Sequence, residues 1–232
     1  MVSECGNFGD EMRSLAEQHE FNVRRWAELV ADPKLAAVPN KIETDADGKI
    51  IMSPPADSDH GDRQAEIAYQ LKGSLPKGKV ITECGVSTSG GTKVPDVVWL
   101  SSQHPQVLKA RVLAANPAPE ICIEILSSDN TAKELREKTA LYFEAGAREV
   151  WICDLEGKMR FLSPTGDLSA SPLFPEFPKV IHTYAEKVAL EREKDFEETV
   201  REDARREPSR SSWPERGEPP KELAREPPGP ER

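Results

Sequence analysis

Residues 94–100, VPDVVWL, form a short apolar segment that begins with a Pro-Asp pair. Val97 and Leu100 are typical of a buried β-strand, and Pro95 suits a strand start because it donates no ladder hydrogen bond. Asp96 is therefore expected where the chain enters a core. A buried carboxylate is costly unless a cation, hydrogen-bond donors or a proton accompany it. Asp96 is thus either the cap of a turn or a residue of a functional site.

A second acid interrupts another apolar segment, EICIEILS at residues 120–127, where Glu124 stands between two isoleucines. A structural salt bridge at this position would need a buried basic partner and would add little net stability. Asp96 and Glu124 are separated along the chain by a distance that suits two strands of one sheet joined by a loop. Two converging carboxylates repel unless one is protonated or a cation lies between them, and hard oxygen ligands favour magnesium or manganese.

The expected helix after this strand, TAKELREKTALYFEAGA at residues 131–147, carries several basic side chains. Lys138 lies on the same helical stripe as Leu141 and Tyr142, so its ammonium can extend along this apolar face toward the end of the strand. The alternative is that Lys138 is a solvent-exposed partner of Glu134, four residues earlier on the helix.

Periodicity and turn signals predict a mixed α/β (α+β) domain with a central mixed sheet flanked by helices. Two hairpins are expected to turn at Asp47-Gly48 and Glu156-Gly157. The segment STSGGTK, residues 87–93, lacks the spacing of a phosphate-binding loop and is interpreted as a turn between strands. The expected elements are a helix in RSLAEQHEFNVRRWAELVAD, strands in KIETDADGKIIMS, a helix in DRQAEIAYQLKGSLP, strands in KVITECGVST, VPDVVWLS and EICIEILS, the helix described above, and strands in REVWICDLEGKMRFLS.

The composition divides the 232 residues into a folded part and a charged tail. Residues 186–232 contain 14 acidic residues, 11 basic residues and seven prolines. We expect an N-terminal extension over 1–19, one domain over 20–185, a charged helix over 186–207 and a disordered tail over 208–232. The tail's net charge of −3 leaves −7 on the rest of the chain, so the tail alone does not cause the acidity.

The net charge of −10 argues against a protein that binds nucleic acid through bulk positive charge, although a local site remains compatible with it. The four cysteines are far apart and form no CxxC pair, which argues against a zinc site or a disulfide framework and for a reducing compartment. The start of the sequence has no basic segment followed by an apolar one, so we expect no signal peptide, and no apolar run is long enough for a membrane span. We therefore expect a cytoplasmic protein.

Several of these segments, in this order, resemble the Uma-type family of restriction endonucleases, within the PD-(D/E)XK nuclease superfamily. The segments are VPDVV with Asp96, EICIEILSSD with Glu124, the helix ELREKTALYFEAGAREVWICD and, upstream, KIETDADGKIIMSPPADSDHGDRQAEIAYQL. The likeness covers about residues 20–185. It implies a restriction-endonuclease-like fold and a metal-dependent endonuclease that hydrolyses phosphodiester bonds in DNA.

The resemblance also implies roles for five residues. Asp96 and Glu124 would bind magnesium or manganese, and Lys138 would be the catalytic lysine on the following helix. Glu66 would add an acid from the first core helix, and His60 would contact the substrate or the water on the metal.

Two positions depart from the family's pattern and one from that of the superfamily. The superfamily at large has a lysine two residues after the strand acid, where this chain has Leu126, but members of this family likewise tend to have an apolar residue there. Ser128 and Glu134 replace a proline and an aspartate that the family usually has.

Candidate partners are DNA as the substrate, a second copy of the chain, and an unidentified protein for the charged tail. Two other functions remain open. The first is a non-enzymatic binding module that kept the fold, which the acidic domain favours. The second is a metal-dependent hydrolase acting on nucleotides or another phosphoester.

Overall fold

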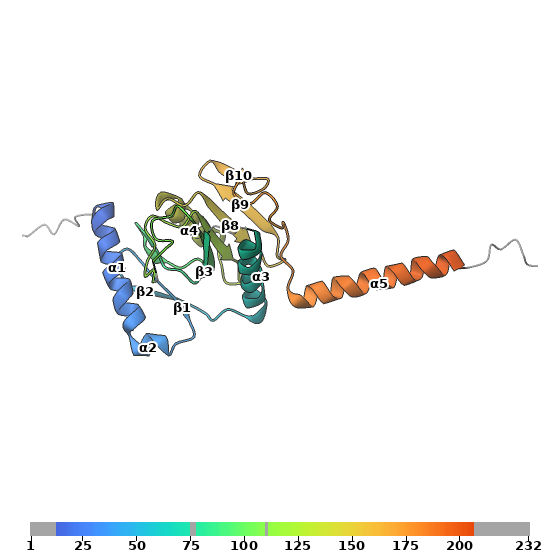
Figure 1. Ribbon diagram of the computed structural model, residues 1–232. Helices are drawn as coiled ribbons and strands as arrows, with labels where there is room; N and C mark the ends of the chain where they lie inside the picture. Colours follow the sequence, from blue (N-terminus) through green and yellow to red (C-terminus); the bar gives the residue numbers. More distant parts are fainter. Residues whose placement is uncertain (1–12, 75–77, 110, 207–232) are drawn as a thin grey trace, which may run out of the picture. The chain divides into compact units, whose positions relative to one another are not determined.

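The computed structural model describes residues 13–74, 78–109 and 111–206, and its central element is a six-stranded sheet (Figure 1). The elements in chain order are α1 (Leu15–Ala31), α2 (Pro33–Ala36), β1 (Lys41–Thr44), β2 (Ile50–Ser53), α3 (Ser58–Ser74), β3 (Gly78–Thr82), β4 (Val86–Thr88), β5 (Gly91–Lys93), β6 (Val97–Ser101), β7 (Ile121–Ile125), α4 (Ala132–Glu144), β8 (Glu149–Cys153), β9 (Met159–Ser163), β10 (Gly166–Leu168) and α5 (Tyr184–Arg206). The strand order of the sheet is β10-β9-β8-β7-β6-β3. Only β7 and β8 run parallel within it, so the sheet is mixed, as predicted.

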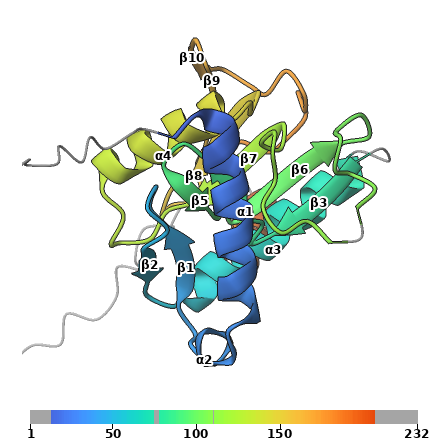
Figure 2. The same cartoon turned by 90° about the vertical axis from the view of Figure 1, so that its left-hand side faces the viewer.

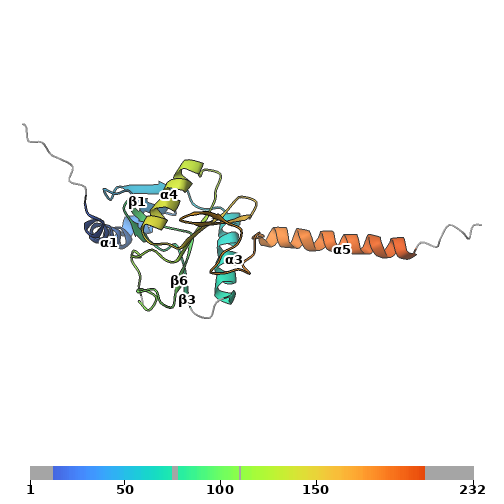
Figure 3. The same ribbon diagram turned by 90° about the horizontal axis from the view of Figure 1, so that it is seen from above.

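The two faces of the sheet bury different side chains because successive strand residues point to opposite sides. On one face Trp99 of β6 packs in a cluster with Leu71 of α3. On the other face Cys122 of β7 packs in a cluster with Tyr142 of α4. Figures 1 and 3 show α3 and α4 flanking the central strands.

Asp96 and Glu124 lie at one end of the β6–β7 ladder. Val97 pairs with Ile123 in this antiparallel ladder, so Asp96 and Glu124 occupy the next position outward on each strand. Because Glu124 is two residues from Cys122, its side chain continues the face that α4 covers. The sheet therefore brings the two carboxylates predicted from the sequence to the same edge.

Two hairpins and α1 form a smaller assembly beside the sheet (Figure 2). The Asn22 side chain of α1 donates a hydrogen bond to Ser87 Oγ of β4 at 2.9 Å. The Thr92 amide of β5 donates to Thr44 Oγ1 of β1, also at 2.9 Å. Gly91 has φ +98°, and a Cβ there would lie 2.2 Å from the Asp45 carbonyl oxygen, so only glycine permits this close approach. These contacts fix β1 next to the Asp96 end of the sheet.

The first turn of α5 is held against α3. The Tyr184 amide donates to Asp62 Oδ2 at 2.6 Å, and the Arg63 guanidinium pairs with Glu186 Oε1 at 2.9 Å. The chain divides after Lys187 into two compact units, and residues 188–206 of α5 belong to the second unit. The helix expected over 186–207 thus begins two residues earlier than predicted.

The expected hairpins and main helices are present, and their turns are where Asp47-Gly48 and Glu156-Gly157 placed them. The sequence did not predict the short α2, β5 or β10. The boundary expected at residue 20 falls inside α1, while the tail expected over 208–232 lies outside the described residues. No helix within the described ranges has both the length and the apolar character needed to cross a membrane.

Candidate active site

Asp96 is 2% exposed, and its carboxylate oxygens accept hydrogen bonds from three directions. The Ile125 amide donates to Oδ2 at 2.6 Å, and Lys41 Nζ lies 2.5 Å from Oδ1. His60 Nε2 lies 3.4 Å from Oδ2. Burial alone would raise the pKa of Asp96, but the hydrogen bond to His60 and the charge of Lys41 outweigh burial and lower it. Asp96 is therefore an ionised carboxylate held by cations and donors rather than the cap of a turn.

Glu124 is also buried, and α4 supplies its partners. The Tyr142 hydroxyl donates to Oε1 at 2.5 Å, and Lys138 Nζ lies 3.3 Å from the same oxygen. Burial raises the pKa of Glu124, although the charges of Lys138 and Lys41 oppose that rise. The predicted approach of Lys138 toward the strand end is confirmed, and its alternative as an exposed partner of Glu134 is not.

Lys138 has a second carboxylate partner that the sequence analysis missed, Glu43 of β1. Lys138 Nζ lies 2.7 Å from Glu43 Oε1, which also accepts a hydrogen bond from the Val94 amide at 2.9 Å. Glu43 is 5% exposed, so Lys138 bridges two buried carboxylates from different strands. Although burial lowers the pKa of Lys138, the charges of Glu124 and Glu43 raise it overall, which keeps the ammonium protonated.

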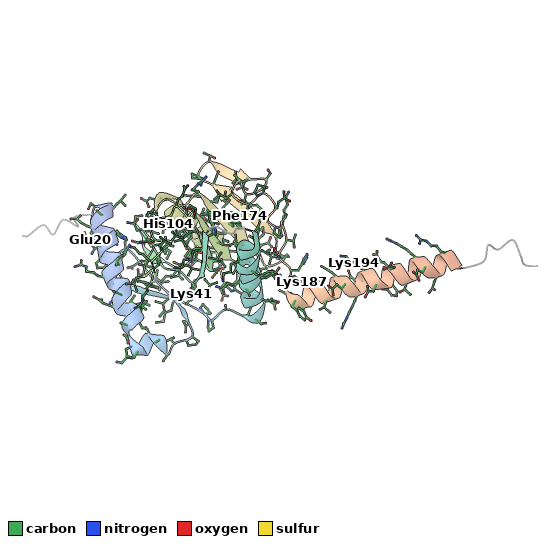
Figure 4. All side chains as sticks on the ribbon, in the orientation of Figure 1. Glu20, Lys41, His104, Phe174, Lys187 and Lys194 are labelled. Carbon is green, nitrogen blue, oxygen red and sulfur yellow. The ribbon has the colours of Figure 1, made fainter. Side chains whose placement is uncertain are left out.

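Lys41, also missed, lies two residues before Glu43 on β1 and is labelled in Figure 4. Besides its contact with Asp96, its Nζ lies 4.0 Å from Glu83 Oε2. Burial opposes its charge, but Glu124 and Asp96 raise its pKa above the ordinary value. The signal was present in KIET: two charged residues two positions apart share one face of a strand. We refer to Lys41, Glu43, Asp96, Glu124 and Lys138 as the carboxylate–lysine cluster.

His60 and Gln64 bring α3 to the cluster. They are one helical turn apart, so they share a face of the helix. Gln64 Nε2 donates to the Asp96 carbonyl oxygen at 2.8 Å and to Glu83 Oε1 at 2.9 Å. The hydrogen bond to Asp96 raises the pKa of His60. His60, predicted from the sequence, therefore lies at Asp96, and Gln64 is a further contact that sequence reasoning missed.

The structure does not bring Glu66 to the cluster. Glu66 follows His60 by six residues, which at about 100° per residue places it about 240° around the helix. Its carboxylate instead lies 2.8 Å from Lys187 Nζ and accepts a hydrogen bond from Gln70 Nε2 at 2.7 Å. Glu66 thus helps to attach the start of α5 to α3.

The donor chemistry at Asp96 and Glu124 fits a hard divalent cation. Both are buried carboxylates, and lysine ammoniums already lie against them, which marks a position that attracts positive charge. Within the part of the chain that the structure describes, no three His, Cys, Asp or Glu side chains are arranged to hold a metal. Magnesium is usually bound through one or two carboxylates together with substrate phosphates and waters, so a pair of carboxylates is sufficient.

Comparison with known proteins bears on the family and the fold of the chain. A family model, Uma2, described as "Putative restriction endonuclease", matches residues 31–169, more than half of the chain, and the carboxylate–lysine cluster lies within that span. A crystal structure from Anabaena variabilis ATCC 29413, titled as "a putative nuclease belonging to DUF820", is similar with a TM-score of 0.53 and 19% sequence identity. The likeness covers 67% of this chain and 93% of that chain, and at this identity it shows the fold. No curated protein matches the sequence.

Proposed function

Because this chain belongs to the Uma2 family, described as "Putative restriction endonuclease", we propose that it is a metal-dependent endonuclease that hydrolyses phosphodiester bonds in DNA. One observation carries the proposal: Asp96 and Glu124 converge from β6 and β7, and Lys138 from α4 lies on Glu124. This combination suits metal-dependent phosphodiester hydrolysis, because a carboxylate pair can bind a cation and a lysine can face a phosphate.

Asp96 and Glu124 would hold magnesium or manganese. Such an ion would supply a water of lowered pKa and would stabilise negative charge on the phosphate oxygens. The protein's own part is to fix the two carboxylates. The Ile125 amide orients Asp96, and the Tyr142 hydroxyl orients Glu124.

Lys138 is positioned to stabilise charge that develops on the phosphate. Its ammonium is held between Glu43 and Glu124, so it stays protonated and needs little reorganisation when charge develops. His60 faces Asp96 from α3 and would contact the substrate phosphate, either as a hydrogen-bond donor or as a cation. Lys41, which also faces Asp96, would release that carboxylate and pair with a phosphate oxygen instead.

Nicking of supercoiled plasmid DNA by the purified full chain with magnesium or manganese tests the proposal. We expect nicking by the wild type that disappears with a chelator and in Asp96→Asn. Glu66→Gln is the matched control, because Glu66 contacts Lys187 and Gln70 rather than the cluster, and it should retain activity. Undiminished nicking by a contaminant-free Asp96→Asn preparation would refute the proposed function.

A further inference from the structure

A cavity of about 250 Å³ lies directly beside the carboxylate–lysine cluster. Its walls come from α1, α2 and β1, which are neighbours in Figures 1 and 2, and from the segments around Glu83 and Val94. Lys41 of the cluster lines the cavity, and so does Glu83, whose Oε2 lies 4.0 Å from Lys41 Nζ. The cavity is therefore continuous with the position where the proposed function places a phosphate.

Most of the cavity wall is apolar and includes one aromatic ring. Trp26 and Leu29 of α1 and Val94 are buried and belong to one hydrophobic cluster. Trp26 is 9% exposed and closely packed, because a Cβ at Gly85 would lie 2.9 Å from its Nε1. At the rim, Val30 is 44% exposed and Ala36 of α2 is exposed. A ligand entering past the rim would meet a fixed indole and aliphatic side chains.

The other end of the cavity is polar. Lys41 Nζ lies 2.5 Å from Asp96 Oδ1 and 4.0 Å from Glu83 Oε2, so a cation and an anion face the cavity side by side. Asn40 also lines the cavity, and its Nδ2 donates to the Ser53 carbonyl oxygen at 2.9 Å. Apolar walls with a few convergent polar groups are the usual composition of a small-ligand site. A ligand with an apolar body and hydrogen-bonding groups matches this lining.

The volume of the cavity and the net charge of the chain both favour a nucleobase as the ligand. A cavity of about 150 Å³ accepts benzene, so the larger volume here has room for a purine or a pyrimidine. The net charge of −10 disfavours a long track of phosphate contacts along a duplex. Stacking of a base on an aromatic side chain supplies affinity that does not depend on such a track.

We propose that this cavity binds one unpaired nucleobase of the substrate, next to the phosphate at the carboxylate–lysine cluster. The base would stack against the Trp26 wall and present its polar edge to Lys41, Glu83 and Asn40. A base inside a duplex cannot enter such a cavity without leaving the stack. The preferred substrate is therefore single-stranded or locally unpaired DNA. This inference rests on the proposed function for its substrate class.

Equilibrium binding tests the inference without relying on cleavage. The probe is a short fluorescein-labelled single strand of mixed sequence, compared with the same strand carrying abasic spacers in place of every base. Anisotropy is measured with the full chain in calcium instead of magnesium. We expect the base-bearing strand to bind at least about tenfold more tightly than the abasic strand, the range expected for base–aromatic stacking.

Two neighbouring alanines of the α2 region provide matched variants. Ala36→Trp places a large side chain in the cavity, whereas Ala37 is equally exposed and does not line it. Ala36→Trp should reduce binding of the base-bearing strand to the abasic level, and Ala37→Trp should leave it unchanged. Val30→Trp and Ala31→Trp, at the end of α1, form a second pair of the same design. Thermal melting confirms that each variant is folded.

Each outcome decides a specific claim. Equal binding of base-bearing and abasic strands, no binding of either strand, or equal effects of Ala36→Trp and Ala37→Trp would overturn the cavity inference. If the wild type nicks plasmid DNA but binds both strands equally, the inference fails and the proposed function stands. If the base-dependent binding is present and metal-dependent cleavage is absent, the proposed function fails and the cavity assignment stands.

Discussion

Glu124 and Glu149 are both buried glutamates on the parallel pair β7–β8, and their surroundings differ in kind. Glu149 accepts hydrogen bonds from Trp151 Nε1 at 2.7 Å and from the Leu173 amide at 3.2 Å. Both donors are neutral and fixed within the fold. Glu124 instead faces the ammonium of Lys138 and the hydroxyl of Tyr142. One carboxylate is satisfied by neutral donors, while the other is paired with a cation.

The two glutamates also differ in their positions in the sheet. Glu149 begins β8 and shares a face with Trp151, in the aromatic cluster on the α3 side. Glu124 stands near the carboxyl end of β7, on the face covered by α4. Ligands of open α/β sheets bind beyond the carboxyl ends of the strands. Glu149 therefore stabilises the fold, whereas Glu124 is available to a ligand. The following substitutions test this difference.

The largest expected effect is on activity, from Glu124→Gln. The amide keeps an acceptor for Tyr142 but removes the charge that would hold a metal, so we expect nicking to fall by about 10³-fold. The free energy of unfolding should change by only about 1 kcal/mol, because Lys138 keeps Glu43 as its ion-pair partner and Tyr142 keeps an acceptor. Plasmid nicking and urea unfolding measure the two effects. Activity within a few-fold of the wild type would show that Glu124, like Glu149, serves only the fold.

The sequence supported this distinction only partly. Asp96, Glu124 and Lys138 were predictable because acids in short apolar strands and a lysine on the following helical stripe are visible locally. Glu149 stands in an equally apolar segment, REVWIC, and the donors that satisfy it come from a residue two positions later and from the distant Leu173. The amino-acid pattern alone therefore does not distinguish a satisfied acid from an available one.

The other site residues that the sequence did not predict also depend on contacts that are not local in the sequence. Lys41 and Glu43 reach the cluster because β1 lies beside β5, a contact between segments far apart in sequence. The resemblance suggested Glu66, but helical geometry turns that residue away from His60 and presents Gln64 instead. Most of the elements and their order followed from local periodicity, whereas the placement of β1 depends on tertiary packing.

The second prediction concerns Lys138→Met. Removing the ammonium leaves Glu43 and Glu124 buried without their shared cation, which should cost about 3 kcal/mol of the free energy of unfolding. Activity per folded molecule should fall by about 10²-fold, since the charge facing the phosphate is lost. Lys133→Met, at an exposed position of the same helix, is the control. Full stability of Lys138→Met would show that the cluster does not depend on this ion pair.

The third prediction applies the Glu124 substitution to Glu149. Glu149→Gln replaces one acceptor oxygen by an amino group that faces a buried donor, so we expect a loss of about 1–3 kcal/mol in the free energy of unfolding. Nicking activity per folded molecule should be unchanged. Urea unfolding and plasmid nicking at matched folded concentration measure both. A loss of activity without a loss of stability would contradict the assignment of Glu149 to the fold.

The smallest expected effect is a pH dependence of stability that His60 and His19 contribute with opposite signs. The hydrogen bond to Asp96 raises the pKa of His60, and Lys41 and Glu83 also face this imidazole. Burial lowers the pKa of His19. The stability due to protonated His60 is fully present below the unfolded-state pKa of about 6.5 and is lost as pH rises through the higher folded-state value. For His19 the sign is reversed, and stability is lost as pH falls below about 6.5.

Each histidine substitution should therefore change the slope of stability against pH in its own direction. His60→Gln should remove a decrease in the free energy of unfolding as pH rises above about 6.5, because Asp96 remains ionised there and its pKa is lowered. His19→Gln should remove an increase in the free energy of unfolding as pH rises toward about 6.5. Urea unfolding at closely spaced pH values measures both slopes. If both substitutions change the slope of stability against pH in the same direction, the contact with Asp96 does not raise the pKa of His60 in the folded protein.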